Sequence, residues 1–139
     1  MVNRNIEKDI IPFCIDHNIG ILAYSPLQRG LLTGKIKKGH KFGEGDSRPD
    51  TIFYKEPNLS SIIQLTENLR IIADEHKVTL SQLVLNWTIQ QPGITCALAG
   101  ARNAEQVLDN VKAADFSLSA AEIKKINDHL ANLKIVTRI

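Results

Sequence analysis

The sequence predicts an α/β protein: a partial (β/α)8 TIM barrel that holds the last two strands with their helices. Two short apolar runs, residues 20–24 and 94–99, are typical of strands in a parallel sheet, and helical patterns precede, separate and follow them. Two parallel strands cannot cover each other's edges, and a complete barrel takes about 250 residues, whereas this chain has 139. The opening helical pattern has no strand before it. We therefore expect one domain, residues 1–139, that lacks the front part of the barrel.

Composition and charge are those of an ordinary globular chain. Hydrophobic residues make up 43%, and 17 Lys and Arg stand against 15 Asp and Glu. This balance lacks the concentrated basic surface that nucleic-acid binding needs. No apolar run approaches the roughly 18 residues of a membrane span, and the polar start has no signal-peptide core. Cys14 and Cys96 lack metal-like spacing, so we expect reduced thiols, a cytoplasmic protein and no metal site.

The first expected element is a helix over residues 5–17. Ile6, Ile10 and Cys14 recur there at near-helical spacing. Pro12 lies inside the pattern and cannot donate a main-chain hydrogen bond. The pattern therefore predicts a helix that is either kinked or begins later than its apolar residues suggest.

A strand and a long loop follow. Residues 20–24 are expected to form a strand buried on both faces, which stops before Pro26 because proline lacks an N–H group. Residues 28–59 hold many glycines and charges and predict an irregular loop at the barrel mouth. Loops of this length are usually functional or disordered.

The later helices carry local start signals. A Ser or Thr followed three residues later by Glu or Gln is the signature of a capping box. This pattern occurs at Ser61 with Gln64, Thr79 with Gln82, and Ser119 with Glu122. Asn103 with Gln106 forms a similar pair after the second strand, and its helix is expected to run to about Lys112.

The turn after the second strand, residues 100–110, is the first candidate site. Free N–H groups and the positive end of the helix dipole meet at such a turn, which favours an anion. Gly100 and Ala101 permit close approach, and Arg102 adds a fork of donors suited to phosphate. The alternative is a capped helix that carries a surface arginine.

The end of the first strand is the second candidate. Tyr24 would point toward the barrel mouth and could stack on a flat heterocycle, while Ser25 could donate to a phosphate or carbonyl. Lys35 supplies a mobile positive charge. The alternatives are a core aromatic at Tyr24 and a solvated lysine.

Together, the two segments resemble a known family. Residues 20–27 (GILAYSPL) and 30–35 (GLLTGK) resemble the seventh-strand region of the aldo-keto reductases. Residues 100–106 (GARNAEQ), ending at Asn110, resemble that family's eighth-strand and helix signature. The stretch 79–93 between them also fits, so the resemblance covers almost the whole chain.

The resemblance implies a (β/α)8 barrel that binds NADP(H), a nicotinamide dinucleotide, in an extended form. In the family, the residue in the position of Tyr24 stacks on the nicotinamide. The positions that line the pyrophosphate match Ser25, Pro26, Leu27, Gln28 and Lys35. Those that hold the adenosine 2′-phosphate match Gly100, Ala101, Arg102 and Gln106, and those that meet the adenine match Asp109 and Asn110.

The catalytic residues of the family are not matched. Its catalytic Asp, Tyr, Lys and His lie on earlier strands, before the part that this chain resembles. None of the histidines falls in a matching position: His17, His40, His76 and His129. Neither Tyr24 nor Tyr54 matches the tyrosine that protonates the carbonyl. We therefore expect no catalytic residue here and no reductase activity from the isolated chain.

Three interpretations stay open. The first is the C-terminal part of an NADP-dependent reductase, which contributes to hydride transfer to an aldehyde or ketone. The second is a non-catalytic nucleotide-binding or assembly module, whose open sheet edges pair with another copy or with a separate front half of the barrel. The third is a truncated gene product or an expressed piece of a longer enzyme.

Overall fold

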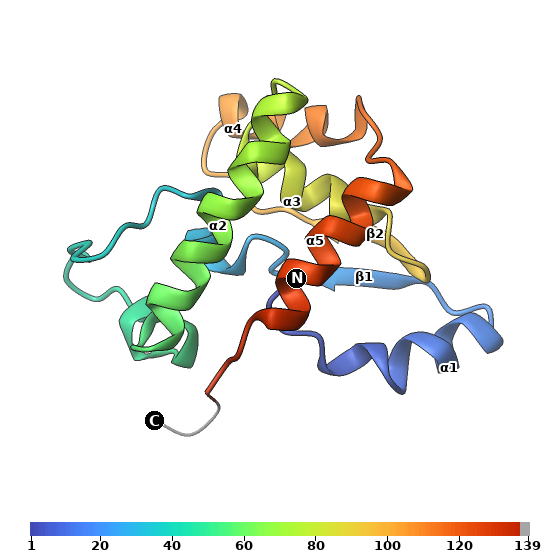
Figure 1. Ribbon diagram of the computed structural model, residues 1–139, viewed down its shortest axis with the longest axis horizontal. Helices are drawn as coiled ribbons and strands as arrows, with labels where there is room; N and C mark the ends of the chain where they lie inside the picture. The colour runs from blue at the N-terminus through green and yellow to red at the C-terminus, as the bar shows by residue number, and fades with distance from the viewer. Residues whose placement is uncertain (137–139) are drawn as a thin grey trace.

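The structure, a computed structural model, describes residues 1–136 and combines two parallel strands with several helices (Figure 1). Strand β1 (Ile21–Tyr24) pairs in parallel with β2 (Ile94–Leu98). The α-helices are α1 (Ile10–Asp16), α2 (Asn58–Glu75), α3 (Leu80–Ile89), α4 (Ala104–Val111) and α5 (Ala120–Asn132). Short 3-10 helices are η1 (Asn5–Glu7), η2 (Gln28–Thr33), η3 (Arg48–Asp50), η4 (Ile52–Tyr54) and η5 (Lys112–Ala114). This α/β architecture agrees with the predicted fold class.

The hydrophobic core lies among α2, α3 and α5, which are grouped together in Figure 1. Each helix buries an apolar stripe, and the fully buried side chains include Ile62, Leu69, Leu83 and Ile126. Helix α3 also packs on β2, so it joins this core to the strands. The helical group therefore holds the sheet from one side.

The first helix begins later than its apolar pattern, one of the two expected outcomes. Residues Asn5–Glu7 form the separate turn η1, and α1 starts at Ile10. Pro12 is then the third residue of α1, where a missing N–H leaves no intrahelical bond unmade.

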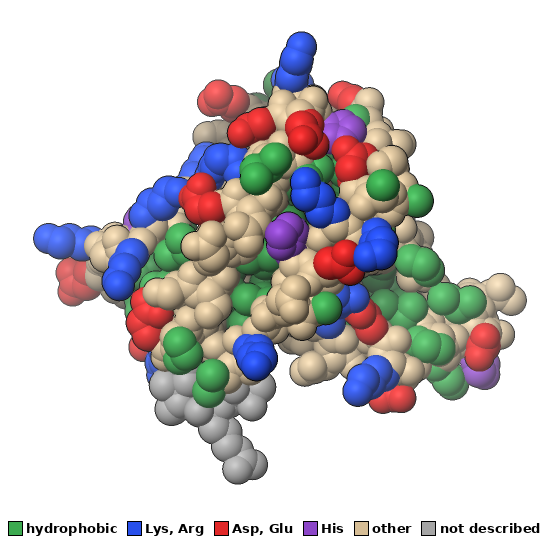
Figure 2. All heavy atoms as spheres, in the orientation of Figure 1, with side chains coloured by type: hydrophobic (Ala, Val, Ile, Leu, Met, Phe, Trp, Pro, Cys, Tyr) green, Lys and Arg blue, Asp and Glu red, His purple; other side chains and the backbone are tan. Residues whose placement is uncertain are grey.

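The prediction that β1 is buried on both faces is wrong. Its residues alternate between intermediate and exposed, and Leu22 is 58% exposed while Tyr24 is 85% exposed. Figure 2 shows hydrophobic side chains gathered on the surface in the region of α1 and β1. The apolar run predicts a strand correctly, but within residues 1–136 no element covers the face that carries Leu22 and Tyr24.

The irregular segment 28–59 is more ordered than expected. It contains η2, η3 and η4, and its last two residues belong to α2. Leu31, Leu32 and Tyr54 from this segment are part of the core. The predicted capping box at Ser61 is wrong, since α2 already begins at Asn58 and the Ser61 hydroxyl donates to the carbonyl of Pro57 at 3.0 Å.

The two other predicted capping boxes are confirmed. Thr79 accepts a hydrogen bond from the Gln82 amide, and the Gln82 side chain accepts from the Thr79 amide. Ser119 and Glu122 form the same reciprocal pair at the start of α5. These local signals fix where α3 and α5 begin.

Candidate functional site

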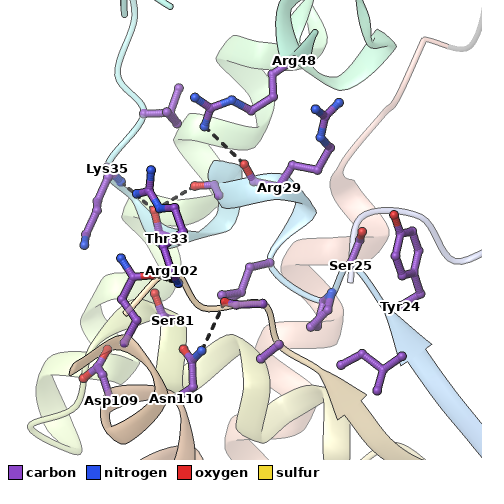
Figure 3. A pocket seen from close by; sticks show the side chains of 18 of the residues that line it. Tyr24, Ser25, Arg29, Thr33, Lys35, Arg48, Ser81, Arg102, Asp109 and Asn110 are labelled. Carbon is purple, nitrogen blue, oxygen red and sulfur yellow. Dashed lines mark hydrogen bonds between the residues drawn. The ribbon is translucent and has the colours of Figure 1, made fainter. Parts of the chain in front are cut away.

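A cavity of about 770 Å³ opens where β1 and β2 end (Figure 3). Its size falls in the range of cavities that hold a cofactor or a small ligand. Ten of the twelve predicted site residues line it: Tyr24, Ser25, Pro26, Leu27, Lys35, Gly100, Arg102, Gln106, Asp109 and Asn110. The structure therefore brings the two candidate segments together at one opening. The exceptions are Ala101 and Gln28, and Gln28 lines a separate groove beside β1.

The turn after β1 has an unusual backbone. Ser25, Gln28 and Arg29 have positive φ angles of 52°, 47° and 55°. Residues other than glycine rarely adopt such angles, and each costs on the order of 1–3 kcal/mol unless its surroundings enforce it. The turn is closed by main-chain bonds from Gln28 to Ser25 at 2.9 Å and from Gly30 to Leu27 at 3.0 Å. A strained turn at the edge of a cavity is a common feature of ligand sites.

The turn after β2 differs in detail from the expected ring of free N–H groups. The Asn103 side chain accepts from the Gln106 amide at 2.9 Å and so caps α4. The Gln106 side chain in turn accepts from the Arg102 amide at 2.9 Å. Two of the amides at this turn are therefore already bonded, and the Arg102 side chain is a further donor in the cavity lining. Gly100 has open space around it.

The cavity is electropositive. Its lining includes the four cations Arg29, Lys35, Arg48 and Arg102 and one carboxylate, Asp109. Within residues 1–136, neither the Lys35 ammonium nor the Arg102 guanidinium has a hydrogen-bond or ion-pair partner. Such a lining favours a ligand with several negative charges.

Arg48 is bound within the loop. Its guanidinium contacts the Asp46 carboxylate at 2.5 Å, and its Nη1 lies 3.5 Å from the carbonyl oxygen of Arg29. The hydrogen bond from Arg48 lowers the pKa of Asp46 to about 2. The pair therefore stays ionised at any working pH. The Arg29 guanidinium donates to the Ser47 hydroxyl at 2.9 Å, which leaves Lys35 and Arg102 as the cations most available to a ligand.

Asp109 is oriented from α3. The buried Gln82 side chain donates from Nε2 to the Asp109 carboxylate at 2.7 Å and to its carbonyl oxygen at 2.9 Å. Asn110, one residue on, lies with its Nδ2 3.5 Å from the carbonyl oxygen of Gly100. The side of the cavity that carries the two predicted adenine contacts is thus fixed by α3 and α4 together.

Tyr24 is an exposed aromatic at the end of β1 and not a core residue. Its ring lines both the cavity and the groove beside β1. An exposed ring at a strand end provides a flat apolar surface for a heterocycle. The alternative interpretation of Tyr24 as a core aromatic is therefore wrong.

Sequence reasoning missed several lining residues, among them His40, Arg48 and Ser81. Arg29 lies within the second candidate segment, but no role was predicted for it. Arg48 and His40 come from the middle of the long segment, and no local pattern places them near the strand ends.

The described residues carry neither a metal-binding cluster nor a membrane-spanning helix. Within residues 1–136, no group of three His, Cys, Asp or Glu side chains is arranged to hold a metal ion. The helices in this part of the chain are all too short or too polar to cross a membrane.

Comparison with known proteins gives concordant matches. The profile of the Aldo/keto reductase family matches residues 1–131. The chain is 31% identical over 122 residues to an NADH-specific methylglyoxal reductase of Escherichia coli. It is 30% identical over 130 residues to the aldo-keto reductase yakc [NADP(+)] of Schizosaccharomyces pombe. The structure of a glycerol dehydrogenase from Gluconobacter oxydans superposes on 99% of the chain with a TM-score of 0.87 and 31% identity.

The matched proteins are longer. The alignments cover 88% and 94% of this chain but 37% of the Escherichia coli protein and 38% of the Schizosaccharomyces pombe protein. The superposition covers 42% of the dehydrogenase. The chain therefore spans about two fifths of the length of the proteins that it matches.

Proposed function

This chain belongs to the aldo/keto reductase family, and from that premise we propose that it is the C-terminal part of an NADP-dependent reductase. Its role is to supply cofactor-binding residues for hydride transfer to an aldehyde or ketone. The observation that carries the proposal is the single electropositive cavity lined by both Tyr24 and Arg102. The reduced cysteines Cys14 and Cys96 suit a cytoplasmic protein.

The residues present fit an extended dinucleotide. The exposed ring of Tyr24 suits the nicotinamide, and the turn after β1 with Lys35 suits the pyrophosphate. Arg102 and Gln106 lie at the turn after β2, where the charge of about −1.5 to −2 on a 2′-phosphate would meet the Arg102 guanidinium. Asp109 and Asn110 are held beside it for the adenine. The cofactor supplies the hydride, and these residues bind and orient it.

The isolated chain is proposed to be inactive. A carbonyl reductase needs a group that donates a proton to the nascent alkoxide. The hydroxyl of Tyr54 is directed at two main-chain carbonyl oxygens, at 3.2 and 3.0 Å, and Tyr54 does not line the cavity. Turnover of an aldehyde by the purified chain above a buffer control would overturn this part of the proposal.

A second candidate is a non-catalytic nucleotide-binding or assembly module. The observation that favours it is the exposure of Leu22, Tyr24 and Leu98 on the two strands. Such a face and its strand edges can pair with another copy or with a separate front half of the barrel. Light scattering that shows a monomer at high concentration, unchanged by addition of the front half of a related barrel, would exclude this candidate.

The decisive experiment compares NADPH and NADH binding. The Arg102→Ala chain should lose one charge-assisted contact to the 2′-phosphate, worth about 1.5–3 kcal/mol. NADPH affinity, measured by fluorescence titration, should then fall about 10- to 150-fold, while NADH affinity changes less than about twofold. Lys125→Ala is the matched control, because it removes one exposed positive charge on α5 outside the cavity lining.

Each outcome of this comparison has a distinct meaning. Equal weakening of NADPH and NADH by Arg102→Ala would show that Arg102 does not contact a 2′-phosphate. Absence of binding of either dinucleotide to the wild-type chain would overturn the proposal that this part binds cofactor by itself.

A further inference from the structure

We propose that Tyr54 is a positioning residue, which holds the turn after β1 in the conformation that meets the dinucleotide pyrophosphate. This inference rests on the proposed function. It assigns a role to η4, which contributes no residue to the cavity lining.

The turn needs support from outside its own residues. Ser25, Gln28 and Arg29 all have positive φ angles, which residues with a side chain adopt at an energetic cost. Strained conformations of this kind persist when neighbouring groups over-determine them. The turn's own main-chain bonds close it, and the carbonyl groups of Gln28 and Arg29 also accept from a side chain outside the turn.

Tyr54 provides that support. Its hydroxyl is directed at the carbonyl oxygen of Gln28 at 3.2 Å and at that of Arg29 at 3.0 Å. The side chain is 6% exposed, so these bonds are shielded from water. Burial also raises the pKa of Tyr54 above its ordinary value, so the phenol remains a donor. The single proton of this hydroxyl is shared between the carbonyls of two consecutive residues of left-handed backbone, with the shorter contact to Arg29.

Tyr54 is itself held by the loop that carries it. The ring of Phe42 packs edge-on against Tyr54 with centroids 5.6 Å apart, and the Arg48 guanidinium lies 5.1 Å from the Phe42 ring centre. Arg48 is anchored by Asp46, and its Nη1 approaches the same Arg29 carbonyl oxygen. Two side chains from residues 48–54 therefore converge on the carbonyl of Arg29, and Figure 3 shows the contact from Arg48.

The orientation of these carbonyls matters to an anionic ligand. Ser25, Arg29 and Gly30 line the cavity, whereas Tyr54 lies outside its lining. The bonds to Tyr54 therefore hold these carbonyl oxygens toward a donor that lies outside the lining. Of the two residues, Arg29 lines the cavity, so its oxygen would repel a phosphate if it turned inward. Freeing them would loosen the turn and weaken binding of the pyrophosphate, the part that NADPH and NADH share.

The test is the Tyr54→Phe chain, which keeps the ring and loses the hydroxyl. We expect NADPH and NADH affinities to fall by the same factor, about 5- to 10-fold. We also expect amide hydrogen exchange at Gln28 and Gly30 to accelerate about 10-fold, because both amides are bonded within the turn. Thr66→Val is the control: it removes another buried hydroxyl, which donates to the carbonyl of Ile63 within α2.

The two measurements separate the possible outcomes. Unchanged exchange at the turn in Tyr54→Phe, or the same change in Thr66→Val, would overturn the positioning role. Faster exchange with unaltered affinities would overturn the link from the turn to the ligand, as would an effect on NADPH alone. If the wild-type chain binds neither dinucleotide, the proposed function fails, and the exchange rates still decide whether Tyr54 holds the turn.

Discussion

Replacing Gln82 by Glu isolates the contact between α3 and Asp109. In the wild type, Gln82 Oε1 accepts from the Thr79 amide at 2.9 Å, while Nε2 donates to Asp109 at 2.7 and 2.9 Å. Glutamate keeps the first bond and loses the other two, and it places a second carboxylate against Asp109. Hydrogen bonds to charged groups contribute about 1.5–3 kcal/mol. We therefore expect the free energy of unfolding at pH 7 to fall by about 2–3 kcal/mol.

The loss of unfolding free energy in Gln82→Glu should depend on pH. Burial and the Asp109 charge raise the pKa of the introduced carboxyl above its unfolded value of about 4.3. The folded variant then binds more protons than the unfolded chain over that interval, so its stability increases as the pH falls through the raised pKa. A protonated carboxyl can also donate again, and near pH 5 the deficit should shrink to less than about 1 kcal/mol.

Urea unfolding followed by far-UV circular dichroism at pH 7 and pH 5 measures both effects. Gln82→Met is the control for titration: it removes both bonds to Asp109, and also the bond from the Thr79 amide, without adding a titratable group. Its deficit relative to wild type should be the same at the two pH values. A Gln82→Glu chain as stable as wild type at pH 7, or one with an equal deficit at both pH values, would refute the reasoning.

Two further predictions concern stability. Leu69→Ala removes a fully buried side chain from α2 and should cost about 2–5 kcal/mol of unfolding free energy, whereas Leu108→Ala, at a position that is 66% exposed, should cost less than about 0.5; equal costs would contradict the assigned core. Glu122→Gln should destabilise the chain at neutral pH, since hydrogen bonds from Ser119, followed by His76, lower the pKa of Glu122 to about 2. A carboxyl whose pKa is lowered by folding stabilises the folded state at pH values above its unfolded pKa of about 4.3. The difference in unfolding free energy between wild type and Glu122→Gln should therefore narrow as the pH falls from about 4.3 toward 2. Unfolding curves measured across that range would show a constant gap if this assignment is mistaken.

Helix-start signals whose partners lie within three residues of each other can be predicted from the sequence. The capping boxes at Thr79 and Ser119 were predicted because all their partners lie within three residues. The same pattern at Ser61 was misleading, since Ser61 lies inside a helix that begins at Asn58. The pattern shows that a residue can cap a helix, whereas the residues before it decide whether the helix begins there or earlier.

Contacts between residues far apart in the sequence could not be predicted from local patterns. An apolar run predicts β1, but the exposure of Leu22 depends on which elements cover the strand. The bond from Tyr54 to Arg29 spans 25 residues and follows no periodic pattern. For the site, the family motifs predicted which segments meet at the cavity. The hydrogen bond from the Arg102 amide to the Gln106 side chain could be found only in the three-dimensional structure.

The parallel pairing of β1 with β2 has a consequence for folding. The Ile21 amide bonds to the Thr95 hydroxyl across 74 positions of chain, so the sheet cannot form until that long segment has been drawn in. Local contacts in α2 and α3 can form early, and by ordering the segment between the strands they reduce the entropy that is lost when the two strands pair. We therefore expect the strand ends to assemble late, and a molecule bound across both of them would stabilise this part of the fold against local opening.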